Sequence, residues 1–576
     1  MPSHRQPNSL EGLSLGRVCR QLNETCRYLQ MLSQKSSATQ VLALAKRTIR
    51  PYYINALPTH LRSRVIDEAM KTMCSPSSDE STLVSAPAAL YLLALLLDPN
   101  IKKLKVGLCC YYGCSHQTCL LKLFASEGVG LRSLQLSRSA LLRLDCKLLY
   151  SALLNMKNLS RLTLRNIADD GVLQAIGKTC PKLAVLDVAC SRQVTDIGLR
   201  QLLLRVELRD KPRSTSSQER TSWSRLKRLL SVLKSKSSRR EKQSVVLEFH
   251  ESRNPLCDTL GVLNVANTGV TSAGVLFALA NVPHLKSLAE YSHMGRVMEI
   301  MNGGLIDRIK IPFSLTQARS CKTTLNRIEL LAQACPKMEK LHISEPHHSP
   351  EALGLFPYIT SLSIHNVPMK REWLNGFYNY LRRNGQNLYD LNFQMTQSEN
   401  PLQVDLREIL NSCPNLHVLI TSGANVTWME GCDPPPLKYL KVIQLGRMTN
   451  ALAIVKILSL VPELKALHVY SCLDLSDKHL ETLKPPTKSK STRKFDMCDD
   501  SSSNLTCFYI YEMHKVSLIT VLNMFNNYKQ LRQFGNLTNW TLNREDAKML
   551  RTTRTSMDVD FCSGSHWLWN NCIPIL

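Results

Sequence analysis

The stretch Cys180-Pro-Lys-Leu-Ala-Val-Leu-Asp-Val-Ala-Cys190 decides the fold of this chain. After Pro181, aliphatic side chains recur at Leu183, Leu186 and Val188. Proline cannot donate a hydrogen bond to a sheet, so it belongs just before a strand. Apolar residues at every second position are typical of a strand with one buried face. The stretch therefore predicts a short strand that begins after Pro181.

The same pattern recurs along the chain at irregular intervals of a few tens of residues. Further openings lie at Pro283, Pro336, Pro357, Pro414, Pro435 and Pro462, answered by Leu288, Leu341, Leu362, Leu419, Leu440 and Leu467. The spacing without proline begins at Ile101, Leu131, Leu159, Leu260, Leu388 and Leu505. Such recurrence indicates an array in which each repeat buries its apolar face only against its neighbours. It favours a binding surface over a catalytic pocket.

The second half of the repeat carries a family resemblance. Val194-Thr-Asp-Ile-Gly-Leu199 follows the opening stretch, and Val265-Ala-Asn-Thr-Gly-Val-Thr-Ser-Ala-Gly-Val275 repeats it. Apolar residues at helical spacing follow the strands, and Cys335-Pro336 and Cys413-Pro414 repeat the helix-to-strand junction. The pattern resembles the cysteine-containing leucine-rich repeat of F-box substrate receptors. That resemblance implies an α/β fold: a curved leucine-rich-repeat solenoid with a strand plus a helix in each repeat and strands on the concave side.

Two helices are expected ahead of the repeats, as a short all-α N-terminal cap. In the first, Val41, Ala45 and Ile49 lie four residues apart and share one face. Pro51 is expected to end this helix. A second, short helix should start after Leu57-Pro58, with Leu61 and Val65 on one face. Arg62, Arg64 and Asp67 would then lie on its solvent side.

This helix pair resembles the elongin-binding box and cullin box of receptors for cullin–RING ubiquitin ligases, notably the Zyg-eleven group. The resemblance implies that these positions bind an adaptor and a cullin: Val41, Leu44, Ala45, Ile49, Leu57, Pro58, Leu61 and Val65. Gln40 replaces a small residue, Val41 replaces leucine and Ala45 replaces cysteine. Packing of a helical cap explains the same residues. An F-box opening at Leu57-Pro58 is a rival, but the turn-like Met73-Cys-Ser-Pro-Ser-Ser-Asp79 argues against it.

The strand pattern proposes contact residues for a partner. Side chains that flank the inward leucines should face the concave side. The proposed substrate-binding residues are Lys340, His342, Ser344, Ser363, His365, Tyr439, Lys441, His468 and Tyr470. Lysine, histidine and tyrosine suit an acidic or phosphorylated peptide. The alternative is that these residues are polar surface with no partner.

Charge singles out one insert in the repeats. The chain has a net charge of +26, and residues 205–242 hold 13 Lys or Arg against 4 Asp or Glu, a net of +9. Within this segment Trp223, Leu226, Leu230 and Leu233 are spaced as in a basic amphipathic helix. Such a helix could bind nucleic acid, an anionic membrane or a protein groove, and Arg239-Arg240 suggest a nuclear import signal. A solvated loop is the simpler interpretation.

Boundaries follow from these patterns. We expect an N-terminal segment at 1–38, the box-like helical region at 39–99, repeats at 100–204, the basic insert at 205–245, repeats at 246–545 with a loop at 484–504, and a C-terminal cap at 546–576. Because the N-terminus lacks an apolar signal core and the longest apolar run, Ala88 to Leu97, is too short to span a bilayer, we expect a cytoplasmic protein, with the nucleus as the alternative location.

Catalytic and metal-binding patterns are poor. Phosphate-loop, dinucleotide-binding, zinc-protease and serine-hydrolase motifs are absent from the sequence. Cys110, Cys114, His116 and Cys119 could be drawn as a zinc site, but no second cysteine pair answers them. His347-His348 lies in a Pro/Ser loop and is expected to face solvent. We therefore expect no enzyme, metal or cofactor.

The functional expectation is a non-catalytic substrate-recognition subunit of a cullin–RING ubiquitin ligase. It would bind an elongin-type adaptor and a cullin through its N-terminal helices and an unidentified protein on its concave face. The alternatives are a leucine-rich-repeat scaffold without a ligase link, an F-box-type receptor with its own adaptor, and a nucleic-acid binder that uses the basic insert.

Overall fold

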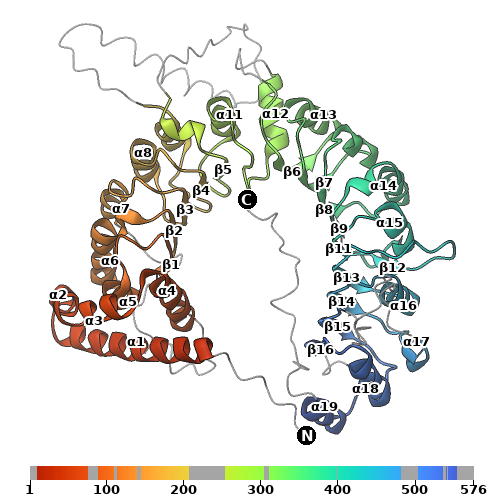
Figure 1. Cartoon of the computed structure of the whole chain (residues 1–576). Helices are drawn as coiled ribbons and strands as arrows, with labels where there is room; N and C mark the ends of the chain where they lie inside the picture. The colour runs from red at the N-terminus through yellow and green to blue at the C-terminus, as the bar shows by residue number, and fades with distance from the viewer. Residues whose placement is uncertain are drawn as a thin grey trace, which may run out of the picture. The chain divides into compact units, whose positions relative to one another are not determined.

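The computed structural model describes residues 10–74, 89–108, 113–138, 145–205, 253–303, 311–396, 398–481, 504–535, 540 and 542–553. The chain divides into two compact units, an N-terminal unit from Asn8 to Leu315 and a C-terminal unit that begins at Thr316. In each unit the strands lie along one side and the helices along the other (Figure 1).

The N-terminal unit begins with a helical cap. Its helices are α1 (Leu10–Lys35), α2 (Ala38–Thr48), α3 (Arg50–Ala56), α4 (Thr59–Cys74) and α5 (Ala89–Leu96). The strands β1 (Lys103–Leu108), β2 (Ser133–Arg138), β3 (Arg161–Arg165), β4 (Val185–Asp187) and β5 (Val262–Asn264) pair in parallel and in chain order. The helices between and after them are α6 (Gly113–Glu127), α7 (Cys146–Leu153), α8 (Asp170–Thr179), α9 (Asp196–Leu203), α11 (Ser272–Asn281) and α12 (Met294–Asn302), with short 3₁₀ turns at Gly128–Gly130 and Pro255–Asp258.

The C-terminal unit repeats this alternation around a longer parallel sheet. Its strands, in their order across the sheet, are β6 (Gln317–Thr323), β7 (Lys340–Pro346), β8 (Ser361–Val367), β9 (Asp390–Met395), β11 (Val418–Ser422), β13 (Val442–Met448), β14 (Ala466–Ser471), β15 (Cys507–Glu512) and β16 (Gln533–Gly535). A separate pair is formed by β10 (Gln403–Asp405) and β12 (Asn425–Thr427).

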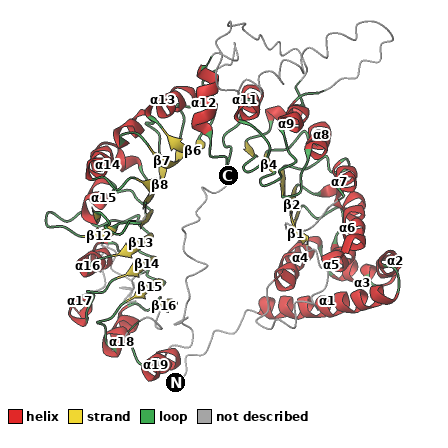
Figure 2. Ribbon diagram, turned by 180° about the vertical axis from the view of Figure 1, so that it is seen from behind, coloured by secondary structure: helices red, strands yellow, loops and turns green. Residues whose placement is uncertain are grey.

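Helices cover one face of this longer sheet (Figure 2). They are α13 (Leu325–Ala334), α14 (Arg371–Asn384), α15 (Leu406–Ser412), α16 (Ala451–Leu460), α17 (Asp477–Glu481) and α18 (Leu518–Asn527), followed by α19 (Arg544–Thr553). Two 3₁₀ turns, Pro350–Leu355 and Gly385–Asn387, complete the described elements. The chain is therefore an α/β repeat fold.

The leucines that revealed the repeat form the core beneath each sheet. Leu134, Leu162, Leu186 and Leu263 occupy one register position on successive strands of the N-terminal unit. In the C-terminal unit the same position is held by Leu341, Leu362, Leu391 and Leu419. All eight are at most 1 % exposed. Burial of one such side chain stabilises a protein by about 2 kcal/mol, so the ladder explains why the strand spacing is kept.

A left-handed turn ends many of the repeat strands. Positive φ angles occur at the non-glycine residues Asn166, Cys190, Asn267, Ala289, Lys322, Glu345, Asn366 and Arg447. Most of these positions lie at or just after the end of a strand. L-amino acids adopt this conformation rarely, and asparagine tolerates it best. Lys322, Glu345, Asn366 and Arg447 are the next-to-last residues of their strands, whereas Asn166, Cys190 and Asn267 follow theirs.

Residues at the starts of successive helices join neighbouring repeats side by side. Asp170 of α8 accepts hydrogen bonds from the Thr195 backbone N–H and hydroxyl, each 2.7 Å long. One repeat later, Asp196 accepts the equivalent bonds from Thr271, at 2.8 and 2.7 Å. Gly274 is required here, since a Cβ atom at this residue would lie 2.0 Å from Asp196 Oδ1. The second half of the sequence motif is thus an inter-repeat ladder.

Cysteines at the repeat junctions are buried thiols. Cys180, Cys257, Cys335 and Cys413 are each 0 % exposed. All four are free cysteines. Burial raises the pKa of Cys335 and of Cys413 to about 12. They behave as small apolar core residues.

Repeats on both sides of the basic insert belong to the N-terminal unit. The strand β5, which follows the insert, pairs with β4, which precedes it. The compact units instead divide between Leu315 and Thr316. The repeat that opens at Pro283 makes only an isolated bridge between Val262 and Ser287. The insert at 205–245 lies almost entirely outside the described residues, and the loop at 484–504 nearly so, as does the tail beyond residue 553.

The repeat that opens at Pro435 has a register different from the predicted one. Ile443, and not Leu440, aligns with Leu419 and Leu467 on the neighbouring strands. Leu440 is still buried, at 0 % exposure, but it lies before β13. The physical reason is the run Pro434-Pro-Pro436, which cannot join a ladder and delays the strand.

Candidate protein-binding site

The predicted adaptor and cullin box folds as part of the helical cap. Val41 and Ala45 of α2 are 4 % and 0 % exposed, and Val65 of α4 is 3 % exposed, so all three face the interior. Ile49, Leu57 and Leu61 are half-buried. Leu44, by contrast, is 54 % exposed, and Pro58 is exposed. Of the predicted box, Leu44 and Pro58 present the most surface to a partner, and the binding role of all eight residues stays a prediction.

Helix boundaries in this region follow the prolines closely. α4 begins at Thr59, directly after Leu57-Pro58, as predicted. Pro51 does not end α2, which stops at Thr48; it lies in the first turn of α3. Proline is well tolerated there because the first turn needs no N–H partner.

Arg62 does not face solvent, contrary to expectation. Its residue is 3 % exposed, and its guanidinium bonds Asp98 Oδ2 at 2.6 Å and the Ile54 carbonyl at 3.2 Å. Arg50 forms a second ion pair, with Glu127 Oε1 of α6 at 2.9 Å. These ion pairs join the box-like helices to the first repeat. Arg62, which the sequence pattern placed on the solvent side of its helix, therefore stabilises the packing of the cap.

The strand face of the C-terminal unit is formed by side chains of β6 to β16 that point away from the core leucines. His342 aligns with Arg319 and Ser363 on the adjacent strands, and Ser344 aligns with His365. Farther along the sheet His468 aligns with Gln444 and Tyr509. Lys340 and Tyr470 also lie on these strands. The structure therefore places most of the predicted contact residues on one face, in two groups.

Tyr439 and Lys441 are exceptions, since both precede β13. Their predicted place on the strand is wrong for the reason given above, the delay caused by the three prolines. Gln444, which is 1 % exposed, takes the position predicted for Lys441. The Tyr439 ring instead stacks on His417, with centroids 5.8 Å apart.

The first group holds a cluster of basic and hydroxyl side chains. The rings of His342 and His365 meet edge to face with centroids 4.5 Å apart, and Ser363 Oγ lies 3.1 Å from His365 Nε2. Burial and the neighbouring Arg319 cation lower the pKa of His342 to about 3 and that of His365 to about 4. Both imidazoles are neutral at pH 7.

Arg319 was missed by sequence reasoning. Its strand, Gln317–Thr323, carries Ala318 and Ser320 at the two core positions, where other repeats carry leucine or isoleucine. The apolar alternation that marks the other strands is therefore lost on this strand. Only its distance from the next repeat could have indicated a strand here. Among the described residues, Arg319 Nε and Nη2 are buried without a hydrogen-bond partner.

The second group is aromatic. The rings of Tyr470 and Tyr511 stack with centroids 5.2 Å apart, and Tyr470 is 43 % exposed. His468 and Tyr509 lie side by side on the same strands, with centroids 6.0 Å apart. Rigid aromatic rings supply contact area at low entropic cost. This group suits a protein or peptide surface.

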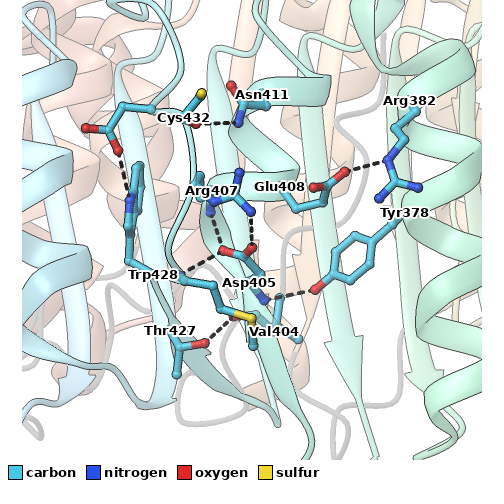
Figure 3. Close-up of polar contacts among 12 residues, drawn as sticks. Tyr378, Arg382, Val404, Asp405, Arg407, Glu408, Asn411, Thr427, Trp428 and Cys432 are labelled. Carbon is cyan, nitrogen blue, oxygen red and sulfur yellow. Dashed lines mark hydrogen bonds and ion pairs between the residues drawn. The ribbon is translucent and has the colours of Figure 1, made fainter.

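A separate polar network lies beside β10 and β12 (Figure 3). Asp405 pairs with Arg407 at 3.1 Å, and its backbone N–H donates to the Tyr378 hydroxyl at 2.9 Å. Asn411 Nδ2 donates to the Cys432 carbonyl at 3.2 Å. The contact between Asn411 and Cys432 joins the loop after β12 to α15, and the contact between Asp405 and Tyr378 joins β10 to α14. The network is accounted for by these structural contacts.

The remaining candidates are the pair His347-His348 and the residues considered for a zinc site. His348 is buried, at 7 % exposure, and its carbonyl accepts a hydrogen bond from Trp373 Nε1 at 3.1 Å. The expectation that both histidines face solvent therefore holds only for His347. Cys110 lies outside the described residues, while His116 Nε2 lies 3.0 Å from the Tyr91 hydroxyl. Within the described ranges, no cluster of His, Cys, Asp or Glu could hold a metal ion.

No described helix combines the length and hydropathy needed to cross a bilayer.

Comparisons with known proteins return matches only among solved structures. No family model and no curated protein matches the sequence. A chain of the yeast Rad7–Elc1 complex is 12% identical with a TM-score of 0.34, covering 93% of this chain and 96% of that one. A leucine-rich-repeat protein of Leptospira interrogans is 14% identical with a TM-score of 0.32, covering 86% and 98%.

An internalin from Listeria monocytogenes is also similar, at 14% identity and a TM-score of 0.30, covering 66% of this chain and 89% of that one. TM-scores of this size carry no weight on function. The repeat fold is assigned from the strand pairing and the buried leucine ladder of the chain itself.

Proposed function

We propose that this protein is a non-catalytic recognition subunit. Its repeats, forming a leucine-rich-repeat solenoid, hold a protein partner on the strand face of the C-terminal unit, and its helical cap connects that partner to a cullin–RING ubiquitin ligase. Such a subunit supplies proximity between target and ubiquitin-loaded enzyme, and needs no reactive residue of its own.

The observation that carries this proposal is the composition of the strand face. Polar and aromatic side chains replace leucine on the side of the sheet that helices do not cover. The stacked Tyr470 and Tyr511 provide an aromatic anchor, and the Arg319 guanidinium retains buried N–H groups without a partner among the described residues. Aromatic and arginine side chains dominate the binding energy of protein interfaces.

The ligase link is supported by the N-terminal helices. Their resemblance to the adaptor and cullin boxes extends to the helix that begins directly after Leu57-Pro58. Because Val41 and Ala45 pack inside the cap, docking rests on the outward residues Leu44 and Pro58. Tyr52 of the adjoining α3 is also 66 % exposed, which adds apolar surface to the same region of the chain.

Recovery of ligase subunits tests the link. The tagged full-length chain should recover an elongin-type adaptor and a cullin, and Leu44→Asp should reduce that recovery at least tenfold, since loss of a buried apolar anchor costs about 1.5–3 kcal/mol. Ile519→Asp on α18 is the matched control, because Ile519 is 70 % exposed and lies in the other unit.

A scaffold without a ligase link is the second candidate, favoured by the burial of Val41 and Ala45. It predicts that the wild-type chain recovers neither adaptor nor cullin while other proteins still bind the strand face. Equal recovery of ligase subunits by the wild type and Leu44→Asp would likewise remove the support for docking through the cap.

A further inference from the structure

We propose that Arg319, His342 and His365 form a subsite for a phosphate monoester, carried by a phosphorylated side chain of the protein partner. The proposal rests on the proposed function, since it names the chemical class that the strand face recognises. It adds Arg319, which lies on β6, to the contact residues expected from sequence.

The geometry brings three donors together on adjacent strands. Arg319 and His342 occupy the same register position on β6 and β7. His365 lies on β8, with its ring centroid 4.5 Å from that of His342. Ser363, 3.1 Å from His365 Nε2, adds a hydroxyl to the cluster. Strand register places Arg319 beside His342, and the ring contact brings His365 to His342 from the next strand.

Unfulfilled hydrogen bonds point to a ligand. Within the part of the chain that the structure describes, Arg319 Nε, Arg319 Nη2 and His342 Nδ1 are buried and have no partner. His342 is only 9 % exposed. A buried donor without an acceptor costs about 1–3 kcal/mol. Arg319 and His365 are half-buried, so both keep part of their surface exposed.

The charge of the cluster selects an anion. Arg319 carries the only fixed charge of the three, while His342 and His365 are neutral and can each donate one N–H. Lys322 and Lys340 lie on the same two strands as Arg319 and His342. The acidic residues of the adjoining strands are Glu345, at the end of β7, and Asp390, which is placed near Lys340 and bonds Ser361.

A phosphate fits these donors better than a carboxylate does. The guanidinium fork can satisfy two oxygens, and the two imidazoles approach from neighbouring strands and can satisfy others. A carboxylate has two oxygens, whereas a phosphate monoester has three non-bridging oxygens and a charge of about −1.5 to −2 at pH 7. The three donor side chains therefore match an anion with three acceptor oxygens.

Peptide capture tests the subsite. The purified full-length chain is presented with a degenerate peptide pool that has a central phosphoserine or phosphothreonine, with the same pool unphosphorylated, and with inorganic phosphate as competitor. We expect the phosphorylated pool to be retained at least tenfold better. Arg319→Gln should lower its affinity about 10- to 100-fold, as expected for the loss of charge-assisted hydrogen bonds. Lys337→Gln, which removes one exposed charge outside the strands, is the control.

A histidine readout separates binding from a structural effect. Because a bound phosphate places negative charge beside both imidazoles, the pKa values of His342 and His365 should rise from about 3 and about 4 when the phosphopeptide is added, as followed by NMR. Arg319→Lys should keep the fold and restore only part of the affinity, since lysine cannot form the fork.

Three results would overturn the subsite. One is equal retention of the phosphorylated and unphosphorylated pools. Another is unchanged capture by a folded Arg319→Gln variant. The third is binding of inorganic phosphate with no retention of any phosphopeptide, which would indicate a free-anion site. If the subsite fails while the wild-type chain still recovers ligase subunits and partner proteins, the proposed function survives without it.

Discussion

His342 is a buried polar residue whose protonation would destabilise the folded state. Its ring is held at 9 % exposure between Arg319 and the neighbouring His365. Burial, followed by those two neighbours, lowers the pKa of His342 from the ordinary 6.5 to about 3. The folded state therefore favours neutral His342, whereas the unfolded chain takes up a proton near pH 6.5. We therefore expect His342 to make the folded chain less stable in acid than at neutral pH.

We predict a specific acid sensitivity from this residue. Between pH 6.5 and pH 3 the unfolded state binds more protons than the folded state, so stability falls as pH falls through that window. From pH 7 to pH 5, His342 should account for about 2 kcal/mol of the lost free energy of unfolding. Chemical denaturation at both pH values would measure it. His342→Gln should reduce the loss, and His347→Gln, at an exposed position, should not. An equal loss in all three proteins would refute this assignment.

Residue-scale inference from sequence succeeded where alternation was intact. His342, Ser363 and His365 could be placed on one face because Leu341, Ile343, Leu362 and Ile364 mark both core positions of β7 and β8. Arg319 could not be found, since Ala318 and Ser320 occupy those positions on β6. Arg62 was misplaced because a helix periodicity reports polarity but not the presence of Asp98 in a distant segment.

The hydrogen bonds of the inter-repeat ladder fix where α9 and α11 begin and join them to the preceding helices. Asp170 and Asp196 each join the helix start of one repeat to the Thr residue that caps the next helix. The side chains of Thr195 and Thr271 in turn accept bonds from the first turns of α9 and α11. A helix cap and a repeat contact are thus made by the same few residues.

We predict that Gly274→Ala disrupts this ladder. The added Cβ would lie 2.0 Å from Asp196 Oδ1, so the carboxylate must move and lose its bonds to Thr271. Overpacking of this kind costs about 1–3 kcal/mol in the free energy of unfolding. Gly171→Ala is the matched control, because its nearest atom would be 3.4 Å away. Denaturant unfolding of the two variants checks the prediction, which fails if both are equally stable.

Element-scale prediction was limited by local irregularity. The spacing of leucines predicted most strands of both units, because the leucines align from one repeat to the next. It gave no opening for β6, β10, β12 or β16. The strand at Val442–Met448 was displaced because proline geometry, and not the leucine spacing, decides where it can begin. The Pro283 repeat has the right spacing but forms only a bridge. Periodicity identifies an element, and backbone chemistry sets its register.

At the scale of the whole molecule, the chain has two compact units with different proposed roles. The N-terminal unit combines the helical cap with a parallel sheet, and the C-terminal unit holds the longer sheet and the proposed recognition face. Sequence anticipated repeats in both, but not the division at Leu315, because the basic insert is the stronger compositional boundary. The role of that insert, including nucleic-acid or membrane binding, stays a prediction.

The most direct test of the central claim is quantitative recovery of proteins by the tagged full-length chain. It compares the wild type, a Tyr470→Ala/Tyr511→Ala variant of the strand face, and Tyr358→Ala, a control at an exposed tyrosine between strands. We expect the double variant alone to lose at least tenfold of one or more partner proteins, since aromatic anchors contribute about 2 kcal/mol or more to an interface. Adaptor and cullin should be recovered equally by all three. An unchanged set of partners in the double variant would contradict recognition by the strand face.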